Sequence, residues 1–105
     1  MTDVLKDYAG REIRLTDERK QHILEHPEMQ GLEAAIGDTL AHPETATRSL
    51  SDSTVWLYYR YYRETPVGEK WLCVVVKVDP ADAFVITAYL TDKVKRGDVI
   101  WSAKQ

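Results

Sequence analysis

Two of the three histidines lie close together in the stretch RKQHILEHPEM, residues 19–29, with a glutamate between them. His22, Glu25 and His26 spell H-x-x-E-H, the inverzincin form of a zinc-protease motif. Histidine also has a pKa near neutral pH, so the pair could transfer protons in a reaction without metal. A third interpretation gives both histidines no role beyond the surface of a helix.

A metal site is the weakest of these three interpretations. Two histidines one helical turn apart can hold a metal ion, but a catalytic site needs a third protein ligand and an open position. Pro27 would end the helix at the second ligand, His42 follows a second predicted helix, and Cys73 lies in an apolar run that we expect to be buried. We therefore expect neither a metal nor another cofactor.

A predicted helix positions the histidines. Thr16 is a good N-cap, and the helix should end at or before His26 because proline restricts the residue that precedes it. Ile23 marks the buried side, which puts Arg19, His22 and His26 on the flank between core and solvent. An arginine beside two histidines makes a strip that attracts anions.

The stretch VWLYYRYYR, residues 55–63, combines tyrosine with arginine, which can stack on bases and bind phosphates. Tyrosine is also a common packing residue in sheets, whereas an arginine within an apolar strand needs an anionic partner. The sequence does not say which face of this strand meets the helices. One face would carry Trp56, Tyr58, Arg60 and Tyr62, and the other Val55, Leu57, Tyr59, Tyr61 and Arg63.

Two further hydroxyl groups occur at alternate positions in AFVITAYL, residues 83–90. Thr87 and Tyr89 would share one face of a strand and could hydrogen-bond a phosphate, while Lys70 adds a cation at the start of the preceding strand. We expect the opposite face to pack under the helices. That face carries Phe84, Ile86, Ala88 and Leu90.

The order of the elements is that of an α+β domain, with helices first and a sheet after them. A short strand, GREIRLT, precedes the histidine helix, and a second helix in GLEAAIGDTLAHP closes at Pro43. The second half predicts an antiparallel meander of three strands, preceded by a short strand in ETATRS and followed by the edge strand VIW. We predict a single domain over residues 1–105.

Composition excludes several classes of protein. Of 105 residues, 44% are hydrophobic and 30% charged, so the chain is neither disordered nor membrane-like, and the longest apolar run, residues 71–76, cannot cross a bilayer. The net charge of −3 divides into −5 for residues 1–53 (6 Lys+Arg, 11 Asp+Glu) and +2 for residues 54–105 (8 and 6). The basic excess leaves room for a local phosphate-binding face. The lone cysteine and the absence of a signal-peptide pattern predict the cytoplasm.

Taken in order, these motifs resemble those of the phage- and toxin-associated small RNases of the barnase–EndoU–colicin E5/D–RelE-like group. The resemblance covers about residues 11–101, and the motifs that carry it are R-x-x-H-I, H-P-E, a second helix ending at Pro43, LYYRYY, KWLCVVVKV and ITAYL. The resemblance implies two N-terminal helices packed on a four- or five-stranded antiparallel sheet, with RNA lying on the sheet. It also implies metal-independent endoribonuclease activity.

In that chemistry a base removes the proton of the ribose 2′-OH, the alkoxide attacks the adjacent phosphate, and an acid protonates the leaving 5′-oxygen. The resemblance suggests His22 as the first acid–base residue and His26 as the second, with charge stabilisation by Arg19 and Arg60 and phosphate positioning by Thr87. The substrate-binding residues that we expect are Tyr58, Tyr62, Arg63, Lys70 and Tyr89.

Two features favour a non-catalytic RNA- or protein-binding module that retains the same fold. The pI is about 5.6, whereas many small RNases are basic, and Glu18 and Glu25 on the histidine helix would repel RNA. Besides RNA, the partners that we consider are a cognate inhibitor protein and a second copy of the chain, paired through the VIW edge at Trp101. No membrane partner is expected.

Overall fold

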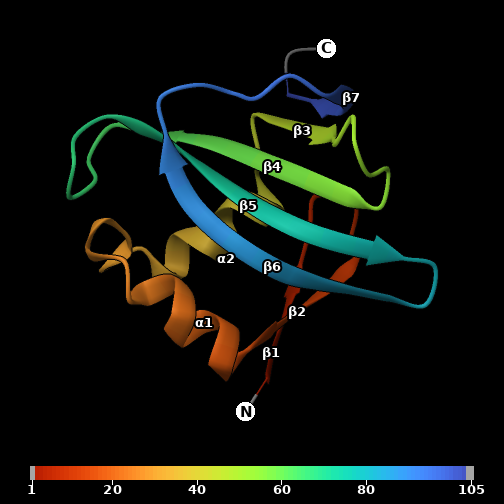
Figure 1. Ribbon diagram of the computed structural model, residues 1–105, viewed down its shortest axis with the longest axis horizontal. Helices are drawn as coiled ribbons and strands as arrows, with labels where there is room; N and C mark the ends of the chain where they lie inside the picture. Colours follow the sequence, from red (N-terminus) through yellow and green to blue (C-terminus); the bar gives the residue numbers. More distant parts are fainter. Residues whose placement is uncertain (1, 104–105) are drawn as a thin grey trace.

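Two α-helices, a short 3₁₀ helix and seven strands make up the protein, whose computed structural model describes residues 2–103 (Figure 1). The strands form one mixed sheet in the order β1-β2-β6-β5-β4-β3-β7. Within residues 2–103 no helix has the length and apolar character needed to cross a bilayer. The elements are β1 (Thr2–Lys6), β2 (Glu12–Thr16), α1 (Asp17–Leu24), η1 (Pro27–Met29), α2 (Glu33–Ala41), β3 (Thr45–Arg48), β4 (Val55–Tyr62), β5 (Lys70–Asp79), β6 (Asp82–Thr91) and β7 (Asp98–Ser102).

The helices begin and end where local signals predict. Thr16 caps α1, because its hydroxyl oxygen accepts a hydrogen bond from the Arg19 N–H over 3.1 Å, and the helix ends at Leu24, ahead of Pro27. Both α-helices lie on the same side of the sheet (Figure 1). The core between helices and sheet includes Ile23, Met29, Ile36, Leu40, Tyr58, Leu72, Val74 and Val76.

The other side of the sheet carries a second, smaller apolar cluster. We call this side the helix-free face. Alternation along the paired strands puts one set of side chains on it, in register from β4 through β5 to β6. These side chains are Val55, Leu57, Tyr59, Tyr61, Trp71, Cys73, Val75, Thr87 and Tyr89.

A bulge decides which residues of β6 face the helices. The register of β5 against β6 shifts between Val75 and Val76, so the alternation in β6 changes at that point. The predicted core face of this strand was therefore half wrong, since Phe84 and Ile86 are only half-buried. The β6 residues in or against the core are Ala83, Val85, Ala88 and Leu90.

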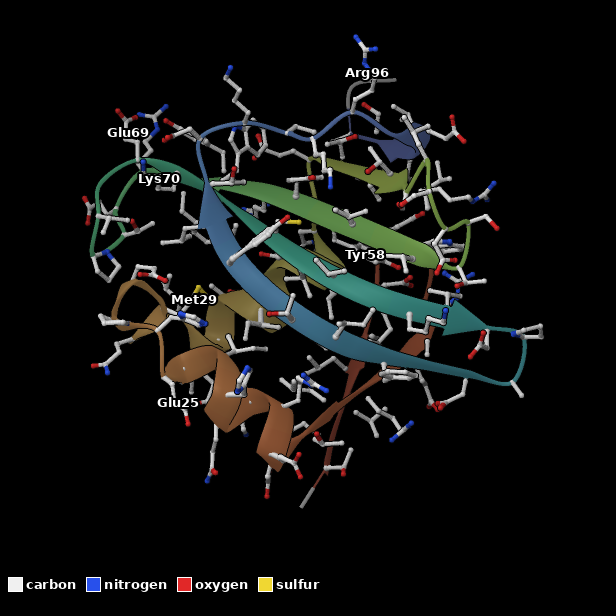
Figure 2. All side chains as sticks on the ribbon, in the orientation of Figure 1. Glu25, Met29, Tyr58, Glu69, Lys70 and Arg96 are labelled. Atoms are coloured by element: carbon white, nitrogen blue, oxygen red, sulfur yellow. The ribbon has the colours of Figure 1, made fainter. Side chains whose placement is uncertain are left out.

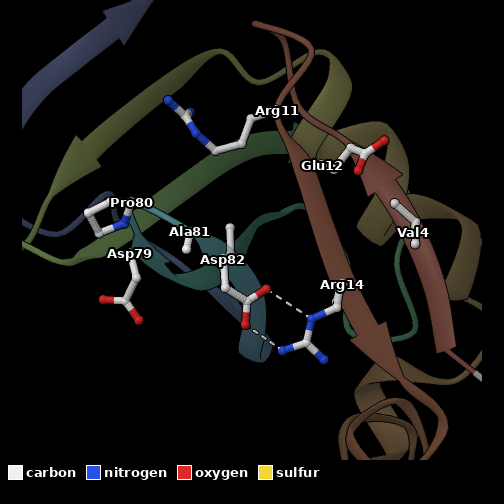
Figure 3. Close-up of a pocket in the computed structure, with 9 residues that line it drawn as sticks. Val4, Arg11, Glu12, Arg14, Asp79, Pro80, Ala81 and Asp82 are labelled. Atoms are coloured by element: carbon white, nitrogen blue, oxygen red, sulfur yellow. Dashed lines mark hydrogen bonds and ion pairs between the residues drawn. The ribbon is translucent and has the colours of Figure 1, made fainter.

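The N-terminal part of the sheet differs most from the prediction. β1 pairs antiparallel with β2, and β2 pairs parallel with β6 at Arg14 and Phe84. The Arg14 guanidinium forms two hydrogen bonds to the Asp82 carboxylate, of 3.0 and 2.6 Å, beside a surface cavity of about 330 Å³ (Figure 3). The α+β class is thus confirmed, but the sheet is mixed and seven-stranded rather than antiparallel with four or five strands.

Residues 92–97, which link β6 to β7, form a strap across the sheet. β6 and β7 run in the same direction but are separated by β5, β4 and β3, so the link has to pass these strands (Figure 1). The Lys95 N–H donates a hydrogen bond to the Tyr59 hydroxyl over 3.1 Å, which places the strap on the helix-free face. Where the strap reaches β3 there is no room for a side chain, because a Cβ on Gly97 would lie 2.8 Å from the Arg48 carbonyl oxygen.

Candidate nucleic-acid interface

A cavity of about 530 Å³ lies on the helix-free face between the strap and the β3–β4 loop. Side chains of three adjacent strands form its floor. The floor is apolar except for two hydroxyl groups, and such a lining with few polar groups is usual for ligand pockets. The floor residues are Val55, Leu57, Val75, Thr87 and Tyr89.

Two cations stand in the strap wall of the cavity. Lys95 and Arg96 are exposed, and the salt bridges found within residues 2–103 involve neither side chain. Arg96 extends outward from the strap (Figure 2). In the opposite wall the hydroxyl oxygens of Ser49 and Ser51 lie 3.1 Å apart. Positive charges facing hydroxyl groups across a cavity suit a phosphate.

The floor itself contains no ready nucleophile. Burial raises the pKa of the Tyr89 hydroxyl to about 12 and that of the neighbouring Cys73 thiol to about 11. Both groups are therefore protonated at neutral pH. Tyr89 can donate a hydrogen bond to a ligand, and Cys73 is a packing residue rather than a reactive thiol.

Aromatic rings extend the helix-free face beyond the cavity. The Tyr61 ring is 38% exposed, and its centroid lies 5.3 Å from that of Trp71 at an interplanar angle of 67°. Trp71 also meets Tyr59 edge to face, with centroids 6.5 Å apart. Bases of single-stranded nucleic acid stack on exposed rings of this kind, with about 1–3 kcal/mol per base.

Charge is divided between the two layers of the molecule. Residues 17–41, which form the helix layer, contain six Asp and Glu but only two Arg and Lys. The strap has three Lys and Arg among its six residues, with one Asp. A polyanion is therefore repelled by the helix layer and attracted to the strap.

The histidine pair belongs to the helix layer and does not line the strap cavity. The side chains of His22 and His26 are 64% and 59% exposed, which puts them on the solvent side of the helix layer rather than on the predicted flank. Their ring centroids are 6.5 Å apart. Of the other predicted catalytic residues, Arg19 lines the same shallow cavity as His22, and Thr87 lies on the helix-free face. In the described part of the chain, no three His, Cys, Asp or Glu side chains could hold a metal together.

Two of the predicted substrate-binding tyrosines point into the helix side of the sheet. Tyr58 is fully buried, and its hydroxyl donates a hydrogen bond of 2.7 Å to the buried Asp7 carboxylate. The Tyr62 hydroxyl lies 3.1 Å from the hydroxyl oxygen of Thr39 in α2. Both hydroxyls thus bond to protein groups.

The cations predicted on the central strands do not line the strap cavity and do not meet at one site. Arg60 donates a hydrogen bond of 2.6 Å to the His42 carbonyl oxygen, and Lys70 pairs with Asp92 at the end of the sheet (Figure 2). Arg63 is exposed just after β4. Of the ten predicted site residues, only Thr87 and Tyr89 meet in the strap cavity.

The sequence reasoning missed Lys95, Arg96 and the two wall serines. The sequence does contain a signal, since KVKR, residues 93–96, places three cations in four residues shortly after the end of β6. The sequence alone does not show where this run lies, because its location depends on the order of the strands in the sheet. A six-residue link between strands of the same direction has to cross the sheet surface.

Comparisons with known proteins find no counterpart: no family model matches the chain, and neither a curated protein nor a solved structure matches it. The resemblance to small RNases therefore stays a prediction. So do the cognate inhibitor and the homodimer through the β7 edge.

Proposed function

We propose that this protein binds RNA on its helix-free face. The observation that carries the proposal is the strap, which brings Lys95 and Arg96 over a cavity floored by Thr87 and Tyr89. Phosphates would contact the two cations, and bases would lie on the exposed ring of Tyr61 and the half-buried ring of Trp71. The choice of RNA rests on the resemblance to RNases that carry their substrate on the sheet.

The acidic helix layer also favours RNA binding on the opposite, helix-free face. Electrostatic repulsion by residues 17–41 disfavours RNA on that side relative to the helix-free face, so the protein needs no overall basic charge to bind a polyanion. Because phosphate contacts release counterions, the affinity should fall steeply as the salt concentration rises.

Fluorescence anisotropy with a short mixed-sequence single-stranded RNA tests the proposal. Lys95→Ala and Arg96→Ala should each weaken binding about fivefold, because each removes a phosphate contact. Lys6→Ala is the matched control, since it removes one positive charge from the exposed β1 strand. Equal effects of Lys6→Ala and Lys95→Ala would contradict a specific interface, and so would the absence of binding by the unmodified protein.

A second candidate function, metal-independent RNA cleavage, is favoured by the exposed histidine pair. Two imidazoles with centroids 6.5 Å apart could flank one phosphodiester, and Arg19 is close enough to His22 to line the same cavity. One imidazole would take the 2′-OH proton, the 2′-oxygen would bond to phosphorus, and the other would protonate the departing 5′-oxygen. The products would be a 2′,3′-cyclic phosphate and a 5′-hydroxyl.

Incubation of RNA with the protein in excess EDTA tests this candidate. Cleavage that persists in EDTA, leaves cyclic phosphate ends and disappears in His22→Ala would support it. Gln21→Ala is the control, because Gln21 also lines the shallow cavity but cannot transfer protons. Intact RNA with the unmodified protein would leave RNA binding as the activity of this fold.

A further inference from the structure

We infer that the strap cavity takes up one unpaired nucleotide of the RNA, with the base on the sheet floor and its phosphate at Lys95 and Arg96. The inference rests on the proposed RNA binding and adds the kind of RNA that this site selects. The cavity volume of about 530 Å³ lies within the range of roughly 300–1,000 Å³ that is usual for small-molecule sites.

The floor matches the face of a base. Leu57 of β4 lies opposite Val75 of β5, and Val55 is the next residue of β4 on the same face, so the three offer an apolar surface to a flat ring. Thr87 and Tyr89 follow on the third strand with hydroxyls that can bond to the polar edge of the base. A flat apolar surface with hydroxyl groups along one side would bind a base but not a bare phosphate.

The walls match the sugar–phosphate backbone. Lys95 and Arg96 stand on one side of the opening, and the Ser49 and Ser51 hydroxyls stand on the other. A phosphate at this opening would have two positive charges on one flank and hydroxyl donors on the other. Leu50, between the serines, is 63% exposed and offers apolar contact to a ribose.

The walls also exclude a double helix. A base that is paired and stacked presents only its edge, so it cannot lie flat on a floor enclosed between a loop and a strap. Reaching the floor requires a base that is already unstacked or that is turned out of the stack, which costs a few kcal/mol for a paired base. The site should therefore prefer single-stranded RNA.

The cavity is formed before any ligand arrives. The strap is held by the hydrogen bond from Lys95 to Tyr59 and by the close packing of Gly97 on β3. The loop is held by the Ser49 N–H, which donates to the Val55 carbonyl oxygen over 2.9 Å, and by the Thr54 N–H and hydroxyl, which both donate to the Asp52 carboxylate. Binding in a preformed site loses little conformational entropy.

Anisotropy titrations with a single-stranded RNA and a hairpin duplex of the same composition test the inference. The single strand should bind at least about tenfold more tightly, and Thr87→Phe, which fills the floor without changing charge, should remove that preference. Val67→Phe is the control, because Val67 is 51% exposed in the loop between β4 and β5 and does not line the cavity. Equal binding of both RNAs that still depends on Lys95 would overturn the nucleotide site and keep the proposed function. Binding of neither RNA would overturn both.

A second measurement avoids substitution and covers the case in which Thr87→Phe fails to fold. Methyl NMR spectra of the unmodified protein are recorded during titration with adenosine 5′-monophosphate and, separately, with inorganic phosphate. The nucleotide should shift the methyl signals of Val55, Leu57 and Val75, which inorganic phosphate should leave in place. Identical spectra with both ligands would contradict uptake of the base.

Discussion

The backbone N–H of Lys95 donates a hydrogen bond to the hydroxyl of Tyr59 over 3.1 Å. This contact joins two segments 36 residues apart and holds the strap over the one side of the sheet that no helix covers. The cations that the strap carries are thereby set beside an apolar floor. The proposed RNA-binding surface depends on this contact and not on the histidine motif.

Tyr59→Phe should loosen the strap. The change removes the acceptor of the Lys95 N–H and should lower the free energy of unfolding by about 1 kcal/mol. Hydrogen exchange at the Lys95 amide should become faster, and RNA binding should weaken because the cavity loses a wall. Exchange at an unchanged rate would show that the strap does not depend on this hydrogen bond.

Two glycines should respond to alanine in opposite ways. At Gly97 the added Cβ would meet the Arg48 carbonyl oxygen at 2.8 Å, so the strap must shift, with a cost of about 1–3 kcal/mol. At Gly37, within α2, the nearest atom is a Leu5 methyl carbon at 3.7 Å, so alanine should stabilise the helix by about 1 kcal/mol. Thermal or urea unfolding of both variants measures the difference, and equal effects would contradict the close approach at Gly97.

Tyr58→Phe should destabilise the core. The Tyr58 hydroxyl donates to the Asp7 carboxylate, which is fully buried, so its removal leaves a charged oxygen with fewer donors, at a cost of about 2 kcal/mol. Tyr61→Phe is the control, since that side chain is exposed and should have little effect on unfolding. A core variant as stable as the surface control would show that the remaining donors, from Ala9 and Arg11, satisfy Asp7.

Stability should depend on alkaline pH through Cys73. Burial raises the pKa of this thiol to about 11, whereas the unfolded thiol titrates near 8.5. Burial favours the protonated thiol, so its contribution to the free energy of unfolding is fully present below about pH 8.5. This contribution is lost as the pH rises to about 11, and the free energy of unfolding falls by a total of about 3 kcal/mol. Cys73→Ala should reduce this decline, which urea unfolding across that pH range measures. Parallel curves for both proteins would exclude the thiol as the cause.

Local signals in the sequence were sufficient for the helices and the central strands. Thr16 and Pro27 bound α1 through capping and through the restriction before proline, and neither effect needs a tertiary partner. β1 was missed because four of its five side chains are exposed, so no alternation marks it as a strand. It pairs only because a tight turn closed by the Asp7 carboxylate returns the chain alongside.

The candidate site could not be predicted from sequence because its parts meet only in the folded sheet. Thr87 and Tyr89 were recognised as one face, which depends on alternation alone. Their nearness to Lys95 and Ser49 depends on the strand order and on the path of the strap. The histidine motif, by contrast, is complete within one turn of helix and so stands out in sequence wherever the fold places it.

NMR mapping of backbone amides during titration with a short single-stranded RNA would locate the RNA-binding surface. We expect the shifted signals to belong to the strap and to Thr87 and Tyr89, while the signals of α1 stay in place. Shifts concentrated at His22 and His26, with an unchanged strap, would contradict the helix-free face as the RNA-binding surface.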